Sequence, residues 1–238
     1  MKILSMRFLI VAVFFFQTLQ SYAWEYLPHD KRPRWSFEYH FGGVYNFRTP
    51  LNIVQQGHPD IYIHRAEFET EPFTGPHYWD WRFIKWFDFG GISFEGIHQK
   101  IYLVNKPEEV ERFGISHGYN MCVFNYHKSF RWINLVAGAG SVLMHPESTV
   151  RGLKYPEGPG FDIHGYVLRG WVINTAVSHQ IRIWNRFYIN TEAKLTFSQA
   201  RAPIVNGYAD VTNIAFQFIF GGGIDFGYQK IKDKKITQ

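Results

Sequence analysis

The sequence predicts an all-β fold, and three observations support this prediction. Apolar and polar residues alternate with a period of two in long segments, which places the apolar residues on one face of a strand, whereas a helix would space them three or four positions apart. The alternation in residues 35–47 runs well beyond the ordinary strand length of about 5–6 residues. Aromatic residues make up 19% of the 238 residues and charged residues also only 19%, a composition that favours burial over disorder.

The first 23 residues have the pattern of a signal peptide. Lys2 and Arg7 form a basic start, and residues 9–16 (LIVAVFFF) form a short apolar core. Residues 21–23 end on Ala23 with small residues at the first and third positions, which fits cleavage after Ala23. We therefore expect an exported protein.

The formal net charge of +5 belongs mainly to the ends of the chain. Residues 229–238 form a basic tail that contains four lysines and one aspartate, whereas residues 24–228, the predicted barrel domain, are close to neutral. Nucleic-acid binding needs a basic patch on the fold, so no nucleic-acid partner is expected. Cys122 is the only cysteine, which excludes an internal disulfide and a four-cysteine zinc site.

Eight strands are predicted, and the connections between them alternate in length. The predicted strands are 34–47, 61–87, 91–103, 113–126, 130–144, 162–183, 187–202 and 209–228. Three-residue turns at 88–90, 127–129 and 184–186 alternate with longer loops at 48–60, 104–112, 145–161 and 203–208. Short turns at one end and long loops at the other are typical of an outer-membrane barrel with both termini in the periplasm. The predicted fold is thus an antiparallel up-and-down transmembrane β-barrel.

Two of these strands are irregular. Pro72 and Pro76 interrupt residues 61–87, and proline cannot donate a hydrogen bond to a strand ladder. Either the strand kinks there, or residues 61–72 form a separate extracellular piece. In residues 91–103, Ile97 and Ile101 share the face of Glu95, which a β-bulge would explain.

The pattern over residues 34–228 resembles the small eight-stranded outer-membrane barrels, the group of the OmpA transmembrane domain, OmpX, PagP and PagL types. The last strand, FQFIFGGGIDFGY at 216–228, looks like the terminal signal read by the barrel assembly machinery, although here residues 229–238 follow it. The resemblance implies a location in the outer membrane, contact with outer-membrane lipid and lipopolysaccharide, and the assembly machinery as a partner during biogenesis.

Charged residues in mid-strand are predicted to face the lumen. They are Glu38, Asp80, Arg82, Glu95, Glu192, Lys194 and Asp225, with Arg169 as a further candidate base. Unpaired buried charge costs several kcal/mol, so these groups should pair. They either fill the lumen or form an ion path, and an eight-stranded barrel is just wide enough for side chains, which favours filling.

His117 is the one candidate catalytic residue. It is predicted to share a lipid-facing side with Phe113, Ile115, Tyr119 and Met121. PagL-type lipid A deacylases carry an outward histidine and serine two residues apart, but here Tyr119 stands at that spacing. Ser116 precedes the histidine and is expected to point into the barrel, because adjacent strand residues alternate. Cys122 is likewise expected in the lumen as an inert thiol.

A loop starting at His145 offers ligand candidates. His145, Glu147, Ser148 and Arg151 are close enough in sequence to bind a phosphate or a divalent ion of lipopolysaccharide, although their spacing matches no standard metal motif. No resident metal or cofactor is expected. The leading prediction is a non-enzymatic outer-membrane scaffold that contacts surface partners through its extracellular loops. The alternatives are a lipid A hydrolase that uses His117 and, less favoured, a narrow pore.

Overall fold

The computed structural model describes residues 31–70, 77–130, 133–156, 158 and 165–230, and most of them lie in antiparallel strands. The predicted signal peptide at 1–23, Pro72, Pro76 and the basic tail beyond Lys230 lie outside the described residues. In the described part of the chain, no helix is long and apolar enough to cross a membrane.

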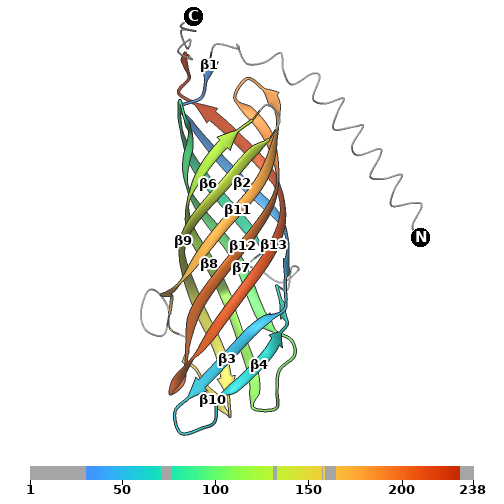
Figure 1. Cartoon of the computed structure of the whole chain (residues 1–238), viewed down its shortest axis with the longest axis vertical. Helices are drawn as coiled ribbons and strands as arrows, with labels where there is room; N and C mark the ends of the chain where they lie inside the picture. Colours follow the sequence, from blue (N-terminus) through green and yellow to red (C-terminus); the bar gives the residue numbers. More distant parts are fainter. Residues whose placement is uncertain (1–30, 71–76, 131–132, 157, 159–164, 231–238) are drawn as a thin grey trace, which may run out of the picture.

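Eight long strands form a closed ring, as the sequence predicts. They are β2 (Trp35–Asn46), β6 (Trp79–Phe87), β7 (Gly90–Leu103), β8 (Val110–Ser129), β9 (Asn134–Val150), β11 (Val167–Trp184), β12 (Phe187–Ile204) and β13 (Gly207–Phe226). Each strand pairs with its neighbours in the order β12-β11-β9-β8-β7-β6-β2-β13, and β12 pairs with β13 to close the ring. Figure 1 shows the strands tilted around a common axis.

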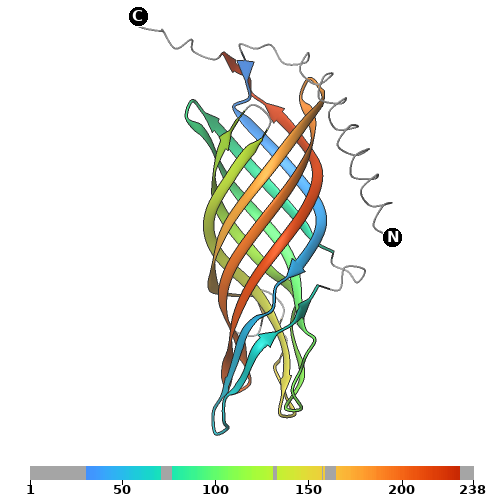
Figure 2. The same ribbon diagram turned by 45° about the vertical axis from the view of Figure 1, so that its right-hand side comes forward.

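Shorter strands extend the barrel at both ends. The ladder of β1 (Lys31–Arg32) with β14 (Gln229–Lys230) joins the two ends of the described chain. At the opposite end, β3 (Thr49–Gln55) and β4 (Ile61–Ala66) form a hairpin whose β3 pairs with β13, while β5 (Phe68–Glu69) pairs with β7 and β10 (Leu153–Lys154) with β9. Figures 1 and 2 show these hairpins projecting from the end of the barrel away from the termini.

Three predicted boundaries are corrected. The loop at 48–60 contains β3, and residues 61–66 form the separate strand β4, which was one of the two alternatives for residues 61–87. The predicted loop at 145–161 is wrong for residues 145–150, because β9 continues to Val150. The turn at 127–129 is also wrong, since β8 runs to Ser129. The bulge expected in residues 91–103 is present as a register shift between Gln99 and Ile101.

The strand β12 changes polarity on both of its faces at the same height. Its inward side chains begin with Tyr188, include Asn190, Glu192 and Lys194, and end with apolar residues such as Ile204. Its outward side chains begin with Phe187, Ile189 and Leu195, and then become polar at Gln199 and Arg201. The half near the termini is therefore polar inside and apolar outside, and the half near the hairpins has the opposite arrangement.

The hairpin half has an ordinary hydrophobic core inside the ring. It is built largely from the inward faces of β3, β4, β8, β9, β12 and β13, and includes Leu51, Ile53, Phe113, Ile115, Met121, Met144, Val150, Ile204 and Val211. The strand β8 has 20 residues, whereas a transmembrane strand needs only about 9–11. The ring thus continues well beyond the length that a bilayer requires.

This inverted half explains an error in the predicted faces of β8. Phe113, Ile115, Tyr119 and Met121 are predicted to face lipid, but all four are buried inside the ring. Apolar side chains face inward in this half, where the outer face of β12 is polar. The face of Cys122 is also wrong: it is partly exposed and alternates with the inward Met121 and Val123, so it lies on the outer wall.

We predict that Phe218→Arg will impair folding into lipid vesicles. Phe218 is 59% exposed on the outer wall of β13, so the substitution places a charge in hydrocarbon at a cost of about 2–4 kcal/mol near the midplane. Reversible urea unfolding in vesicles measures the change.

Two control variants are matched to this test. Phe218→Leu keeps the apolar wall, and Tyr62→Arg places the same charge on the exposed face of the β4 hairpin, where Tyr62 is 57% exposed. Equal stability of Phe218→Arg and Tyr62→Arg would contradict the assigned apolar band.

Candidate functional site

An ion-pair network fills the lumen of the half near the termini. Glu38, Arg82 and Glu95 lie opposite one another on the neighbouring strands β2, β6 and β7, so their side chains enter the lumen at one height. Arg82 is fully buried and donates to Glu38 at 3.1 Å and to Glu95 at 2.7 Å. It also binds both oxygens of Glu192 from β12, at 2.9 and 2.8 Å, and so joins two walls of the ring.

Lys194 is the second buried cation of the network. Its ammonium group forms an ion pair with Asp80. It also donates to Glu95 at 2.5 Å and lies 3.4 Å from Glu192. The carboxylate oxygens of Asp80, Glu95 and Glu192 lie within 4.8 Å of one another, a spacing at which a metal ion would fit. Lys194 already places a cation among these carboxylates.

Further polar groups complete the network, and the sequence analysis did not single them out. His40 Nδ1 donates a hydrogen bond to the Asp80 carboxylate at 2.8 Å, while Tyr188 and Gln180 each donate to Glu38 at 2.9 Å. The signal that points to His40 is its position two residues after Glu38, on the same face of β2. Six of the seven predicted lumen residues therefore meet in one network.

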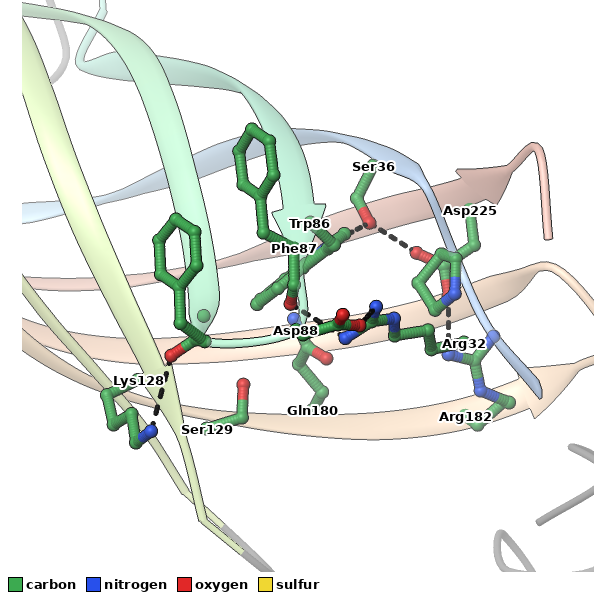
Figure 3. Close-up of a pocket in the computed structure, with 13 residues that line it drawn as sticks. Arg32, Ser36, Trp86, Phe87, Asp88, Lys128, Ser129, Gln180, Arg182 and Asp225 are labelled. Carbon is green, nitrogen blue, oxygen red and sulfur yellow. Dashed lines mark hydrogen bonds and ion pairs between the residues drawn. The ribbon is translucent and has the colours of Figure 1, made fainter. Parts of the chain in front are cut away.

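Asp225, the seventh, lies apart from this network at the open end. It binds Ser36 and Arg182, both at 2.5 Å, beside a pocket of about 290 Å³ at the mouth of the barrel (Figure 3). Arg182 is therefore the additional base of the lumen. The candidate Arg169 is wrong for this role, because it lines a cleft on the outer wall together with Trp171 and Arg201.

Ser116 lies on the outer side of β8, contrary to the prediction, because its neighbour Ile115 packs in the core. At 8% exposure Ser116 is nevertheless buried, whereas His117 beside it is exposed. The pairing of β8 with β9 shifts register between Ile115 and Tyr119, and Gly118 has a φ of 131°, which favours glycine. This bulge interrupts the alternation, so both side chains stand on one side. The Ser116 hydroxyl is 3.0 Å from His117 Nδ1.

Glu147 and Arg112 extend this outer cluster. They form an ion pair, and Glu147 lies on β9 beside the strand that carries Ser116. Since β9 has supplied the about 9–11 residues of a transmembrane strand by Met144, Glu147 lies beyond that span. Burial would raise the pKa of Glu147, but hydrogen bonds from Arg112 and Ser116 outweigh it and lower the pKa below its usual value. Glu147 is therefore a carboxylate at neutral pH.

The other loop candidates do not gather at this cluster as a set. The His145 ring contacts His117, with centroids 4.7 Å apart, so His145 belongs to it. Ser148 is buried among the inward residues of β9. Arg151 instead donates to the Gln55 side chain at 3.1 Å and to the Pro59 carbonyl at 2.8 Å, and so fastens the β3–β4 hairpin to the neighbouring turn.

We predict that Arg82→Leu will destabilise the folded barrel strongly. The substitution leaves three glutamates without their shared cation, and breaking a buried ion pair in this way costs about 3–5 kcal/mol. The control is Arg201→Leu, which removes an ion pair with Asp210 in which both side chains are roughly half exposed. Such surface pairs contribute about 0–1 kcal/mol. Comparable losses in urea unfolding would contradict the buried network.

Comparisons with known proteins find solved structures with a similar backbone arrangement. No protein-family model matches the chain, and no curated protein matches it. The solid-state NMR structure of outer membrane protein AlkL in DMPC lipid bilayers has a TM-score of 0.45 and 11% identity, and covers 86% of this chain and 94% of AlkL. The crystal structure of Ail, the attachment invasion locus protein of Yersinia pestis, with the heparin analogue sucrose octasulfate has a TM-score of 0.35 and 7% identity, and covers 80% of this chain and 99% of Ail.

Proposed function

We propose that the protein is an integral outer-membrane barrel that acts as a scaffold for an extracellular platform. The observation that carries the proposal is the simultaneous change of polarity on both faces of β12, near Ser198 and Gln199. A bilayer requires an apolar outer wall, whereas water requires a polar one. The half near the termini would span the membrane, and the half with the hairpins would stand above it.

The filled interior supports a scaffold in preference to a pore. The ion-pair network occupies the spanning half, and a layer of cross-lumen hydrogen bonds lies above it. Tyr119 of β8 reaches Ser198 of β12 at 2.9 Å. Gln99 of β7 reaches Asn213 of β13 at 3.1 Å. The hydrophobic core closes the hairpin half, so no continuous water path is expected.

The outer wall offers a place for lipopolysaccharide at the boundary between the two halves. A cleft of about 450 Å³ lies beside Trp171, Arg169 and the ion pair of Arg201 with Asp210, so Arg169 is the cation of this cleft that is available to a ligand. Arginine binds phosphate through paired N–H groups, and an exposed tryptophan is typical of the membrane interface. Lipopolysaccharide provides phosphates at this level, so we propose it as the surface ligand of the scaffold.

The location can be tested by fractionation of cells. The protein should separate with outer membranes and migrate faster on a gel when unheated than after boiling, because a barrel that stays folded in detergent is more compact. A soluble periplasmic protein whose migration is independent of heating would contradict the proposal.

A lipid-ester hydrolase is the second candidate function, and the Ser116–His117 contact favours it. In this mechanism Ser116 Oγ attacks the carbonyl carbon of an acyl ester, and His117 takes the hydroxyl proton. Collapse of the tetrahedral intermediate breaks the ester bond, and the proton passes to the alkoxide that leaves. Water then hydrolyses the acyl-serine in the same way and releases a carboxylic acid. Glu147 lies near both residues, and Ser116 donates a hydrogen bond to it.

We predict for this candidate that Ser116→Ala and His117→Ala each restore one ester-linked acyl chain to lipid A. Mass spectrometry of lipid A from cells with each variant measures the chain number. His64→Ala is the control, because His64 is an exposed histidine on the β4 hairpin away from the cluster. If lipid A is identical in wild-type, variant and deletion strains, the hydrolase is excluded and the scaffold remains.

A further inference from the structure

We propose that a cleft at the terminal rim of the barrel binds the headgroup of an anionic phospholipid in the periplasmic leaflet. The cleft has a volume of about 480 Å³ and lies where β2 begins and β6 ends, beside Arg34, Trp35, Lys85 and Phe87. This inference rests on the proposed insertion in the outer membrane, which places the rim at the level of the inner lipid headgroups.

The cleft has more positive than negative charge. Of the three basic residues around it, Arg32 is paired with Asp88 and donates to the Phe87 carbonyl at 2.8 Å, as Figure 3 shows. Arg34 and Lys85 are both exposed, and neither has a carboxylate partner among the residues that the structure describes. Two cations are thus available to a ligand.

Lys85 is held at the end of the apolar wall. Its ammonium group lies 4.8 Å from the centre of the Trp35 ring and 5.3 Å from that of Phe87. These cation–π contacts orient the side chain, and an ammonium group has three donors, so donors remain for phosphate oxygens.

The wall below this cation is aromatic and suits an acyl chain. Trp35 contacts Phe83 with ring centroids 5.1 Å apart, and Phe83 contacts Phe226 at 5.9 Å. All three side chains lie on the outer faces of paired strands, because Trp35 is opposite Lys85 in β6 and Phe226 in β13. The apolar wall and the cations are therefore arranged along the barrel in the same order as the acyl chain and the headgroup of a phospholipid.

The adjacent mouth pocket is a weaker candidate for an anion. It is lined by Arg182, but this cation is already bound to Asp225, and Lys128 donates to the Phe89 carbonyl at 3.2 Å. The rim cleft instead combines uncompensated charge with the lipid-facing wall. A phosphodiester with a net negative charge matches it better than a zwitterionic headgroup.

Native mass spectrometry of the full mature chain in detergent can test this site. We expect phosphatidylglycerol to be retained more strongly than phosphatidylethanolamine. The double variant Arg34→Gln with Lys85→Gln should lower the affinity for phosphatidylglycerol about tenfold. The reason is that each basic residue near an anionic lipid surface adds to the binding free energy, and the variant removes two of them. Lys128→Gln is the control at the same end of the barrel, because Lys128 does not line the cleft.

The outcomes separate this inference from the proposed function. One outcome is that the double variant folds in vesicles, as judged by heat-dependent gel migration, and still binds phosphatidylglycerol as the wild type does. That result would contradict the headgroup site and leave the membrane barrel in place. Equal retention of the two phospholipids by the wild type, or an equal loss with Lys128→Gln, would also overturn it. If the wild type itself fails to insert in vesicles, the proposed function is contradicted first.

Discussion

Closure of the strand ring is the constraint on which the rest of the structure depends. In hydrocarbon every backbone N–H and C=O group must find a partner within the protein, so a spanning sheet cannot keep a free edge. The β12–β13 ladder removes the edge, since it runs from Phe187 opposite Ile224 to Ile204 opposite Gly207. Closure then isolates the lumen, and any charge inside it must be compensated within the protein. Arg82 and Lys194 form ion pairs with four surrounding carboxylates, and His40 is hydrogen-bonded to one of them.

The two halves of the barrel solve the burial problem in opposite ways. In the half near the termini, which we propose spans the lipid, polar side chains gather inside and must satisfy one another. In the hairpin half, which we propose stands in water, the interior is an ordinary hydrophobic core that includes Leu51, Ile115 and Val211. This core holds the outer end of the ring rigid, and Arg151 ties the β3–β4 hairpin to it.

Much of the fold, but less of the outer site, could be predicted from the sequence. The faces of β13 and β12 and the lumen charges follow from alternation, because these residues lie within the apolar band. The faces of Phe113 to Met121 could not be predicted in that way, since alternation identifies an apolar face but not whether lipid or a core covers it. The bulge between Ile115 and Tyr119 also changes which residues of β8 face inward, and Gly118 is the residue in the sequence that points to it. Alternation from an assumed lipid-facing Ile115 therefore predicts the wrong face for Ser116, because Ile115 packs in the core.

Amide hydrogen exchange of the protein in lipid nanodiscs tests the closed ring most directly. The β12 and β13 amides are the ones that a ring open at this seam would leave unpaired. If the ring is closed, their exchange in the spanning half will be as slow as that of the β8–β9 ladder, because both ladders are paired along their lengths. Rapid exchange along β12 and β13, with protection retained in β8 and β9, would show an open edge and contradict the closed barrel.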